Sequence, residues 1–131
     1  MFDINRNSTE PLHNQLIHSV KTRMMTGTLQ AGDRLPSIRE LANQLMINPN
    51  IVTRAYQELE KEKLIITVHG SGTFIKKIER KQTTNPQVAT KMKEQLDALL
   101  TEAFFENIEE ITLINWVHQH YEAMKEVDYE D

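Results

Sequence analysis

Residues 32–75 read GDRLPSIRELANQLMINPNIVTRAYQELEKEKLIITVHGSGTFI, and this stretch decides the fold. It contains two short patterns of apolar residues at helical spacing, joined by a tight turn. Two runs rich in β-branched and aromatic residues follow, on either side of the segment 69–72, HGSG. Helix, turn, helix and glycine-tipped hairpin together predict a winged helix-turn-helix, a fold whose commonest use is to read duplex DNA.

The two helices of this stretch carry clear start signals. Ser37, with Glu40 three residues later, predicts a capping box. Asn48 predicts a cap for the next helix, with Pro49 at its first position and Lys63 near its end. The buried side of the earlier helix is expected to comprise Ile38, Leu41, Ala42 and Leu45. That of the later helix is expected to comprise Ile51, Val52, Ala55, Tyr56 and Leu59. Residues 46–48 form the turn between them.

Upstream, residues 11–25 form a further helical pattern. Pro11 suits the first helical position, and the oxygens of residues 8–10 are available for capping. Gly27 is expected to end the helix, and residues 34–36 to be extended. One apolar stripe is made by Leu12, Leu16, Ile17, Val20 and Met24. In the hairpin, residues 64–68 and 73–76 are the predicted strands.

Beyond a polar connector, residues 88–105 predict one helix, and Asn107 with Glu110 indicates a capping box for another. The fold class is therefore mainly α (α+β), with a winged helix-turn-helix at 1–79 and a helical αα-hairpin at 86–131. Two helices cannot bury their apolar faces alone, so the tail must pack either on the first domain or on a second copy of the chain. Of these, we expect a homodimer through this tail, which suits the reading of two DNA half-sites. The expected dimerisation residues are Leu96, Leu99, Leu100, Phe104, Ile111, Ile114, Val117 and Tyr121.

Charge divides unevenly along the chain. Up to Lys81 there are 12 Lys+Arg against 8 Asp+Glu, a net charge of +4, and from Gln82 onward 3 Lys against 11 acids, a net charge of −8. These values add to the −4 of the whole chain. The asymmetry indicates that the first half meets a polyanion and the second half does not.

Several function classes are not expected. The chain has no cysteine, no apolar leader and no apolar run of about 20 residues, so we expect a cytoplasmic protein without a membrane partner. No nucleophile–base pair, phosphate loop or apolar carboxylate pair indicates an enzyme. His118 and His120 are two residues apart and point to different faces of a helix. We therefore expect no metal site and no cofactor.

The stretches 32–42, 48–56 and 70–74 (GDRLPSIRELA, NPNIVTRAY and GSGTF) closely resemble the GntR family of bacterial transcription regulators. The resemblance covers about residues 10–76. The short two-helix tail looks like that of the YtrA subfamily, which lacks the large effector-binding domain of its relatives. This resemblance implies a homodimeric repressor of duplex DNA, often acting on operons that encode ATP-driven transporters.

Residue by residue, the resemblance places Arg39 on phosphates or base edges, Asn48, Asn50, Thr53 and Arg54 at the start of the recognition helix, and His69 and Gly70 at the wing tip. The chemistry agrees, because Asn recognises adenine, Arg recognises guanine and a helix N-terminus attracts phosphate. The full set of expected DNA-binding residues is Arg34, Ser37, Arg39, Asn48, Asn50, Thr53, Arg54, His69 and Gly70. Two alternatives without a DNA contact stay open. In one, Asn48 and Asn50 serve only as helix caps, and in the other, Arg39 serves only as an ion-pair partner of Glu40 or Glu58.

Two positions depart from the family pattern. Lys63 stands where relatives commonly have glycine, so either the helix ends differently or a left-handed lysine costs about 1 kcal/mol. His69 and Ser71 stand where relatives usually carry Arg or Lys, which predicts a weaker grip on phosphate and a shallower dependence on salt.

Two rival functions are a winged helix that binds protein, and a small-molecule sensor with a pocket at the dimer interface. An apolar patch beside the third helix would favour the first. The sequence does not specify the operator, the regulated genes, the sign of regulation, an effector ligand or the geometry of the dimer.

Overall fold

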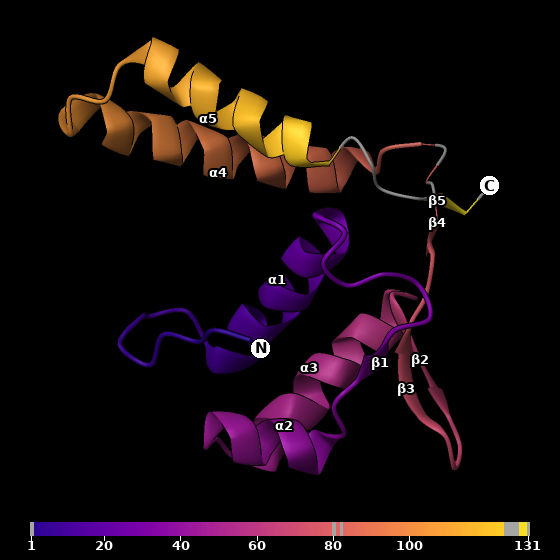
Figure 1. The fold of residues 1–131 in the computed structure, drawn as a ribbon. Coiled ribbons are helices and arrows are strands. Elements are labelled where there is room, and N and C mark those ends of the chain that lie inside the picture. The colour runs from indigo at the N-terminus through magenta and orange to yellow at the C-terminus, as the bar shows by residue number, and fades with distance from the viewer. Residues whose placement is uncertain (1, 80, 82, 125–128, 131) are drawn as a thin grey trace. The chain divides into compact units, whose positions relative to one another are not determined.

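The computed structural model describes residues 2–79, 81, 83–124 and 129–130 of the chain, drawn in Figure 1. The chain divides into two compact units. The first comprises residues 1–79 together with 126–131, and the second comprises residues 80–125. The end of the predicted tail, residues 125–128 and 131, lies outside the described residues.

Three helices build the first unit: α1 (Leu12–Met25), α2 (Ile38–Leu45) and α3 (Pro49–Lys61). Helix α3 is central, because it packs against both α1 and α2 (Figure 1). The predicted apolar faces largely form the core, as the helical spacing indicated. The buried core of this unit consists of Phe2, Leu16, Val20, Met24, Leu29, Leu35, Leu41, Ala42, Val52, Ala55, Tyr56, Leu59, Ile65 and Ile75.

Two details of these helices were predicted wrongly. Ile38 was expected to be buried, but it lies in the first turn of α2 and is 37% exposed. Helix α1 starts at Leu12, with Pro11 as its N-cap and no side-chain capping bond. The hydroxyl of Ser8 instead accepts a hydrogen bond from the backbone N–H of Glu10, at 3.1 Å. It is therefore used in the turn that precedes the helix.

A three-stranded antiparallel sheet completes the winged helix. Its strands are β1 (Arg34–Leu35), β2 (Ile65–Val68) and β3 (Gly72–Ile75), in the order β1-β3-β2. The predicted hairpin is confirmed, with Val68 paired to Gly72 across the turn. One face of the sheet carries the buried Leu35, Ile65 and Ile75. A short parallel pair, β4 (Ile78–Glu79) with β5 (Tyr129–Glu130), had no sequence signal.

Helix α3 ends in a left-handed residue that is not glycine. Lys63 has φ 63°, its N–H donates to the carbonyl of Glu60, and the next N–H, of Leu64, donates to the carbonyl of Leu59. This pair of bonds is the Schellman motif, in which the residue after the C-cap must be left-handed. Of the two alternatives given for Lys63, the structure therefore shows the left-handed lysine and not a different end to the helix.

The second unit contains α4 (Pro86–Phe105) and α5 (Glu110–Ala123). Helix α4 begins two residues before the predicted Val88, because Asn85 caps it by accepting a hydrogen bond from the N–H of Gln87 at 3.0 Å. The predicted cap at Asn107 is wrong. Asn107 has φ 62° and ends α4 in a Schellman motif, a role that suits asparagine because it tolerates the left-handed region.

Candidate nucleic-acid interface

The first turn of α2 is capped by Ser37 and exposed to solvent. The Ser37 hydroxyl accepts a hydrogen bond from the N–H of Glu40 at 3.1 Å, so the capping oxygen predicted from the sequence is in place. Arg39 lies in this turn and is exposed. Among the described residues, neither Glu40 nor Glu58 forms an ion pair with it. The alternative in which Arg39 serves only as an ion-pair partner of these two residues is therefore not supported by the distances in the structure.

Helix α3 has two contrasting faces. Val52, Ala55 and Leu59 are fully buried on one side, whereas Asn50 and Arg54 are exposed. A helix anchored along one whole face presents its other face rigidly, which is what base recognition in a major groove requires.

Asn48 and Thr53 each make a bond within the start of α3. The Asn48 side-chain oxygen accepts from the N–H of Asn50 at 2.9 Å, and the Thr53 hydroxyl donates to the carbonyl of Pro49 at 3.1 Å. Asn48 is exposed, and its amide nitrogen carries two donor hydrogens that the cap bond does not use. Capping and contact with DNA are therefore compatible at this position.

The N-terminal segment stabilises the turn between α2 and α3. The sequence predicted the turn itself but not this contact. The guanidinium of Arg6 donates to the carbonyls of Leu45 and Met46, the latter at 3.0 Å. Met46 is left-handed, with φ 56°, and lies two residues before the cap residue Asn48. No periodic pattern marks residues 2–10, so an arginine that stabilises a distant helix end cannot be recognised there from sequence.

Tyr56 links α3 to the short segment between β1 and α2. Its hydroxyl donates to the carbonyl of Pro36 at 2.7 Å. Burial raises the pKa of this phenol well above its ordinary value, and the nearby carboxylate of Glu40 adds to the increase. The bond fixes the approach of the chain to Ser37, and so the position of the α2 N-terminus relative to α3.

The wing tip is a tight turn in which the N–H of Ser71 donates to the carbonyl of Val68 at 2.9 Å. Gly70 has φ 82°, a conformation that most side chains disfavour. His69 and Gly70 are both exposed at this tip. Exposed backbone without a side chain can approach a duplex closely, in keeping with the predicted role of the tip.

Arg34 belongs to β1, where it pairs with Phe74 of β3, and its side chain reaches the end of β3 next to the tip turn. It sits on Gly72, where an added Cβ would lie 2.8 Å from its Nε atom. Arg34, Ser37 and Thr53 line one cleft of about 310 Å³ between the wing and α3. The structure thus brings these three predicted residues together, while Arg39, Asn48, Asn50 and Arg54 stand on exposed helical turns and His69 and Gly70 at the wing tip.

No large apolar side chain of α3 itself is exposed, whereas Ile38 in α2 and Met46 in the turn before α3 are. Ile66 and Val68 are 43% and 44% exposed, but both belong to the edge strand β2. Met46, in the turn before α3, is 82% exposed. The exposed positions of the first turns of α3 are polar, which favours nucleic acid over a protein partner at that surface.

The expected dimerisation residues all lie on α4 and α5, and all are exposed within the chain. Among the described residues of this unit, Ala103 is the only one that is buried. Leu96, Leu100, Phe104, Ile114, Val117 and Tyr121 line a groove of about 790 Å³. Leu99 and Ile111 lie outside the lining of this groove.

Two kinds of site lack support in the part of the chain that the structure describes. There, no group of three or more His, Asp or Glu side chains is arranged to hold a metal ion. His118 instead lies 3.6 Å from the carboxylate of Glu122, one turn along α5. No helix among these residues is both long and apolar enough to cross a bilayer.

Comparison with known proteins extends the resemblance seen in the sequence. Residues 12–75 match the profile of the bacterial regulatory proteins of the gntR family. The HTH-type transcriptional repressor YtrA of Bacillus subtilis (strain 168) is 38% identical over 119 residues, covering 91% of this chain and 91% of YtrA.

Solved structures agree in fold. A transcriptional antiterminator from Listeria monocytogenes EGD-e superposes with a TM-score of 0.75 at 30% identity, covering 100% of this chain and 98% of the other. A GntR family transcriptional regulator from Listeria monocytogenes superposes with a TM-score of 0.57 at 33% identity, covering 86% and 97%. The matched chains are regulators of gene expression and not enzymes. This chain belongs to the GntR family, the DNA-binding transcription regulators of bacteria.

Proposed function

We propose that this chain is a homodimeric repressor that binds an inverted-repeat operator. The observation that carries the proposal is the pair of exposed polar side chains, Asn50 and Arg54, near the start of α3, a helix whose opposite face is fully buried. In a two-fold dimer, two such helices enter successive major grooves about one helical turn apart. Arg39 contacts phosphates or base edges, the wing tip contacts flanking backbone or the minor groove, and Arg34 lies against Gly72 of the wing.

The exposed apolar surface of the tail supports dimerisation. Twelve large apolar side chains of α4 and α5 are exposed: Val88, Met92, Leu96, Leu99, Leu100, Phe104, Phe105, Ile111, Ile114, Trp116, Val117 and Tyr121. At roughly 100 Å² of exposed area each, they offer about 1,200 Å² per protomer. A typical stable interface buries about 800 Å² per partner. The tail therefore has enough apolar surface for a homodimer.

Selection from genomic DNA tests this function. Purified protein is mixed with sheared DNA of the source genome at physiological salt, and the retained fragments are sequenced. An enriched inverted repeat is the expected result, and the resemblance favours a site beside an operon for an ATP-driven transporter. Repression is then measured with a reporter gene behind the enriched site.

A double variant, Asn50→Ala with Arg54→Ala, is the matched control, because both side chains are exposed and contribute nothing to the core. It should fold and dimerise like the wild type and enrich no sequence. If the wild type is folded and dimeric but also enriches nothing, the proposed operator binding is wrong. Equal enrichment by the double variant would remove the exposed face of α3 from the interface.

A further inference from the structure

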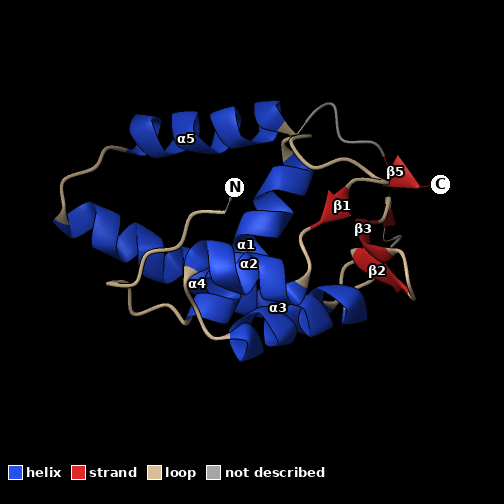
Figure 2. Cartoon of the chain, turned by 60° about the horizontal axis from the view of Figure 1, so that its bottom comes forward, coloured by secondary structure: helices blue, strands red, loops and turns tan. Residues whose placement is uncertain are grey.

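The segment that precedes α1, residues 2–10, contains no helix or strand and is drawn as a loop in Figure 2. It is nevertheless anchored within the first unit. Phe2 is buried in the core, and the guanidinium of Arg23 in α1 lies over its ring, 5.3 Å from the ring centre. A cation over an aromatic face is attracted to it. This contact links the start of the segment to α1.

Gln15 of α1 provides a second anchor for the same segment. Its side-chain oxygen accepts a hydrogen bond from the N–H of Asn5 at 2.6 Å. Its side-chain nitrogen donates to the carbonyls of Asn5 and Glu10, at 3.0 and 2.8 Å. Arg6 directly follows Asn5, so the backbone next to Arg6 is held by α1.

Arg6 extends from this anchored backbone to the turn between α2 and α3, where its guanidinium donates to the carbonyls of Leu45 and Met46. The last carbonyls of a helix have no partner within the helix, and a cation there also interacts favourably with the helix dipole. Met46 is left-handed, a conformation that a non-glycine residue keeps only where its surroundings hold it. The bonds from Arg6 help to hold it.

The conformation of this turn determines where α3 begins. Asn48 caps α3, and Asn50 lies in its first turn. No side chain between residues 46 and 51 is buried, and only Ile47 and Ile51 pack partly against the core. Core packing alone therefore fixes this stretch less firmly than it fixes the rest of α3. Hydrogen bonds, among them those from Arg6, supply the remaining constraint.

Residues 2–10 lie outside the stretch 12–75 that matches the family profile. Building on the proposed operator binding, we propose that Arg6 is a positioning residue for DNA recognition. It holds the turn between α2 and α3 in one conformation, so that Asn48 and Asn50 meet the bases already oriented, and it makes no contact with the duplex itself. A group oriented before binding loses less conformational freedom when it binds.

Affinity and its dependence on salt test this role. Arg6→Ala should lower affinity for the enriched duplex by roughly 3- to 10-fold, the value of one or two hydrogen bonds, with an unchanged salt slope. Arg6→Lys should restore most of the affinity, because an ammonium group can donate to both carbonyls. Fluorescence anisotropy measures these values. An unchanged affinity of Arg6→Ala would overturn the proposal. A salt slope lower by about one would also overturn it, since Arg6 would then contact phosphate directly.

A double-mutant cycle with Gln15 tests whether Arg6 acts through the anchored segment. Gln15→Ala releases the same segment from α1 and should also weaken specific binding. The double variant Arg6→Ala with Gln15→Ala should bind no more weakly than the weaker of the two single variants, because both act through one link. Independent, additive losses would overturn that link. Lys21→Ala is the control: it breaks the 2.9 Å ion pair with Glu62 at the other end of α3 and should leave affinity unchanged.

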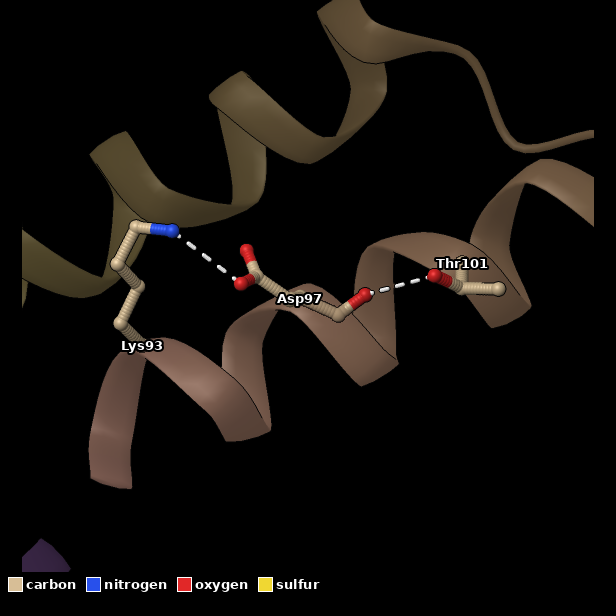
Figure 3. Close-up of polar contacts among 3 residues, drawn as sticks. All are labelled: Lys93, Asp97 and Thr101. Carbon is tan, nitrogen blue, oxygen red and sulfur yellow. Dashed lines mark hydrogen bonds and ion pairs between the residues drawn. The ribbon is translucent and has the colours of Figure 1, made fainter. Parts of the chain in front are cut away.

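Loss of a positive charge is controlled with Lys93→Ala. Lys93 forms an exposed ion pair of 3.2 Å with Asp97 on α4, and the Thr101 hydroxyl donates to the carbonyl of Asp97 at 2.9 Å (Figure 3). Like Arg6→Ala, this substitution removes one cation that has local partners, but it lies in the second unit. Affinity should match the wild type. A loss equal to that of Arg6→Ala would assign the effect to net charge and overturn the positioning role.

The free protein gives a readout that a purely stabilising role would not change. In Arg6→Ala the turn should exchange between conformations, so NMR relaxation dispersion should appear at the N–H groups of Met46, Asn48 and Asn50 but not at that of the buried Leu59. Urea unfolding reports overall stability separately. Unchanged relaxation in the turn would overturn the proposal. If the wild type enriches no DNA sequence, the proposed operator binding fails, and this measurement still decides whether Arg6 holds the turn.

Discussion

Arg39 is the clearest single-residue test of the interface, because it is exposed in the first turn of α2 and makes no ion pair with its acidic neighbours among the described residues. Arg39→Ala should lower affinity for the enriched duplex by roughly 10-fold or more, the value of one or two charge-assisted hydrogen bonds. Fluorescence anisotropy measures it, and circular dichroism should show an unchanged fold.

The same titrations at several salt concentrations assign the contact of Arg39. Loss of a phosphate contact lowers the salt slope by about one, whereas loss of a base contact changes sequence preference instead. Lys91→Ala, which removes one exposed positive charge from α4, should leave affinity unchanged. Equal losses in the two variants would point to net charge rather than to a contact of Arg39.

Tyr56 should make the fold sensitive to alkaline pH. Its pKa is raised in the folded chain, so above the ordinary value of 10 the unfolded chain loses this proton first and the folded state loses stability. Tyr56→Phe should cost about 1 kcal/mol at neutral pH by removing the bond to Pro36, and should reduce the loss of stability at high pH. Urea unfolding at pH 7 and pH 11 measures both; an equal loss in the two proteins would contradict the assignment to Tyr56.

Lys63 offers a stabilising substitution. A left-handed non-glycine residue costs about 1–2 kcal/mol, and glycine gives back part of this through its greater freedom in the unfolded chain. Lys63→Gly should therefore raise the free energy of unfolding by roughly 0.5–1 kcal/mol, measured by thermal or urea unfolding. Glu60→Gly, within α3, is the opposite control and should destabilise by a similar amount. A destabilised Lys63→Gly variant would mean that the lysine side chain stabilises the fold by contacts of its own.

At the scale of elements, the chain starts two helices in the same way, and this allows a matched comparison. Asn48-Pro49 begins α3 and Asn85-Pro86 begins α4, with cap bonds of 2.9 and 3.0 Å. Aspartate caps as well as asparagine, so Asn48→Asp and Asn85→Asp should both keep the free energy of unfolding. Only Asn48→Asp should weaken binding to the enriched duplex, several-fold or more, because it loses an amide donor and places a carboxylate near phosphates.

Anisotropy and urea unfolding of both aspartate variants decide this comparison. If Asn48→Asp binds DNA like the wild type, Asn48 is a cap and nothing more. If both variants lose stability, the amide groups have partners beyond the cap bond.

Elements were predictable where a local chemical signal defines them. The caps at Ser37 and Asn48 and the glycine-tipped hairpin are such signals, and the structure places each as expected. Asn107 was misread because an asparagine between two helices can cap the second or end the first, and the choice depends on backbone geometry. The bond from Arg6 to the end of α2 joins residues about 40 positions apart, which no local pattern encodes.

At the scale of the whole molecule, the apolar groove of the tail is the feature on which assembly should depend. Val117→Glu places a carboxylate on its lining and should convert the dimer into a monomer. Affinity for the inverted repeat should fall by 10-fold or more, because one protomer then holds a single half-site. Sedimentation and anisotropy measure the two effects. Gln119→Glu, on the polar side of α5, should change neither, and a dimeric Val117→Glu variant would place the interface elsewhere.

The tail also marks the limit of sequence reasoning about assembly. Helical spacing identified its apolar stripes and the need for a partner, because two helices expose more apolar surface than they can bury. The spacing did not show that α4 and α5 stand apart, since periodicity places residues on a face but does not say what covers that face.

The division of charge along the chain makes the two associations of this protein respond oppositely to ions. The segment up to Lys81 carries +4 and the rest carries −8, so dimerisation brings two acidic tails together. Added salt screens that repulsion, while it weakens the contacts of the basic segment with phosphates by competing with released counterions. At low protein concentration, the fraction of operator that is bound should therefore first rise and then fall as the ionic strength increases. The position of this maximum is set by the weaker of the two equilibria, dimerisation and DNA binding.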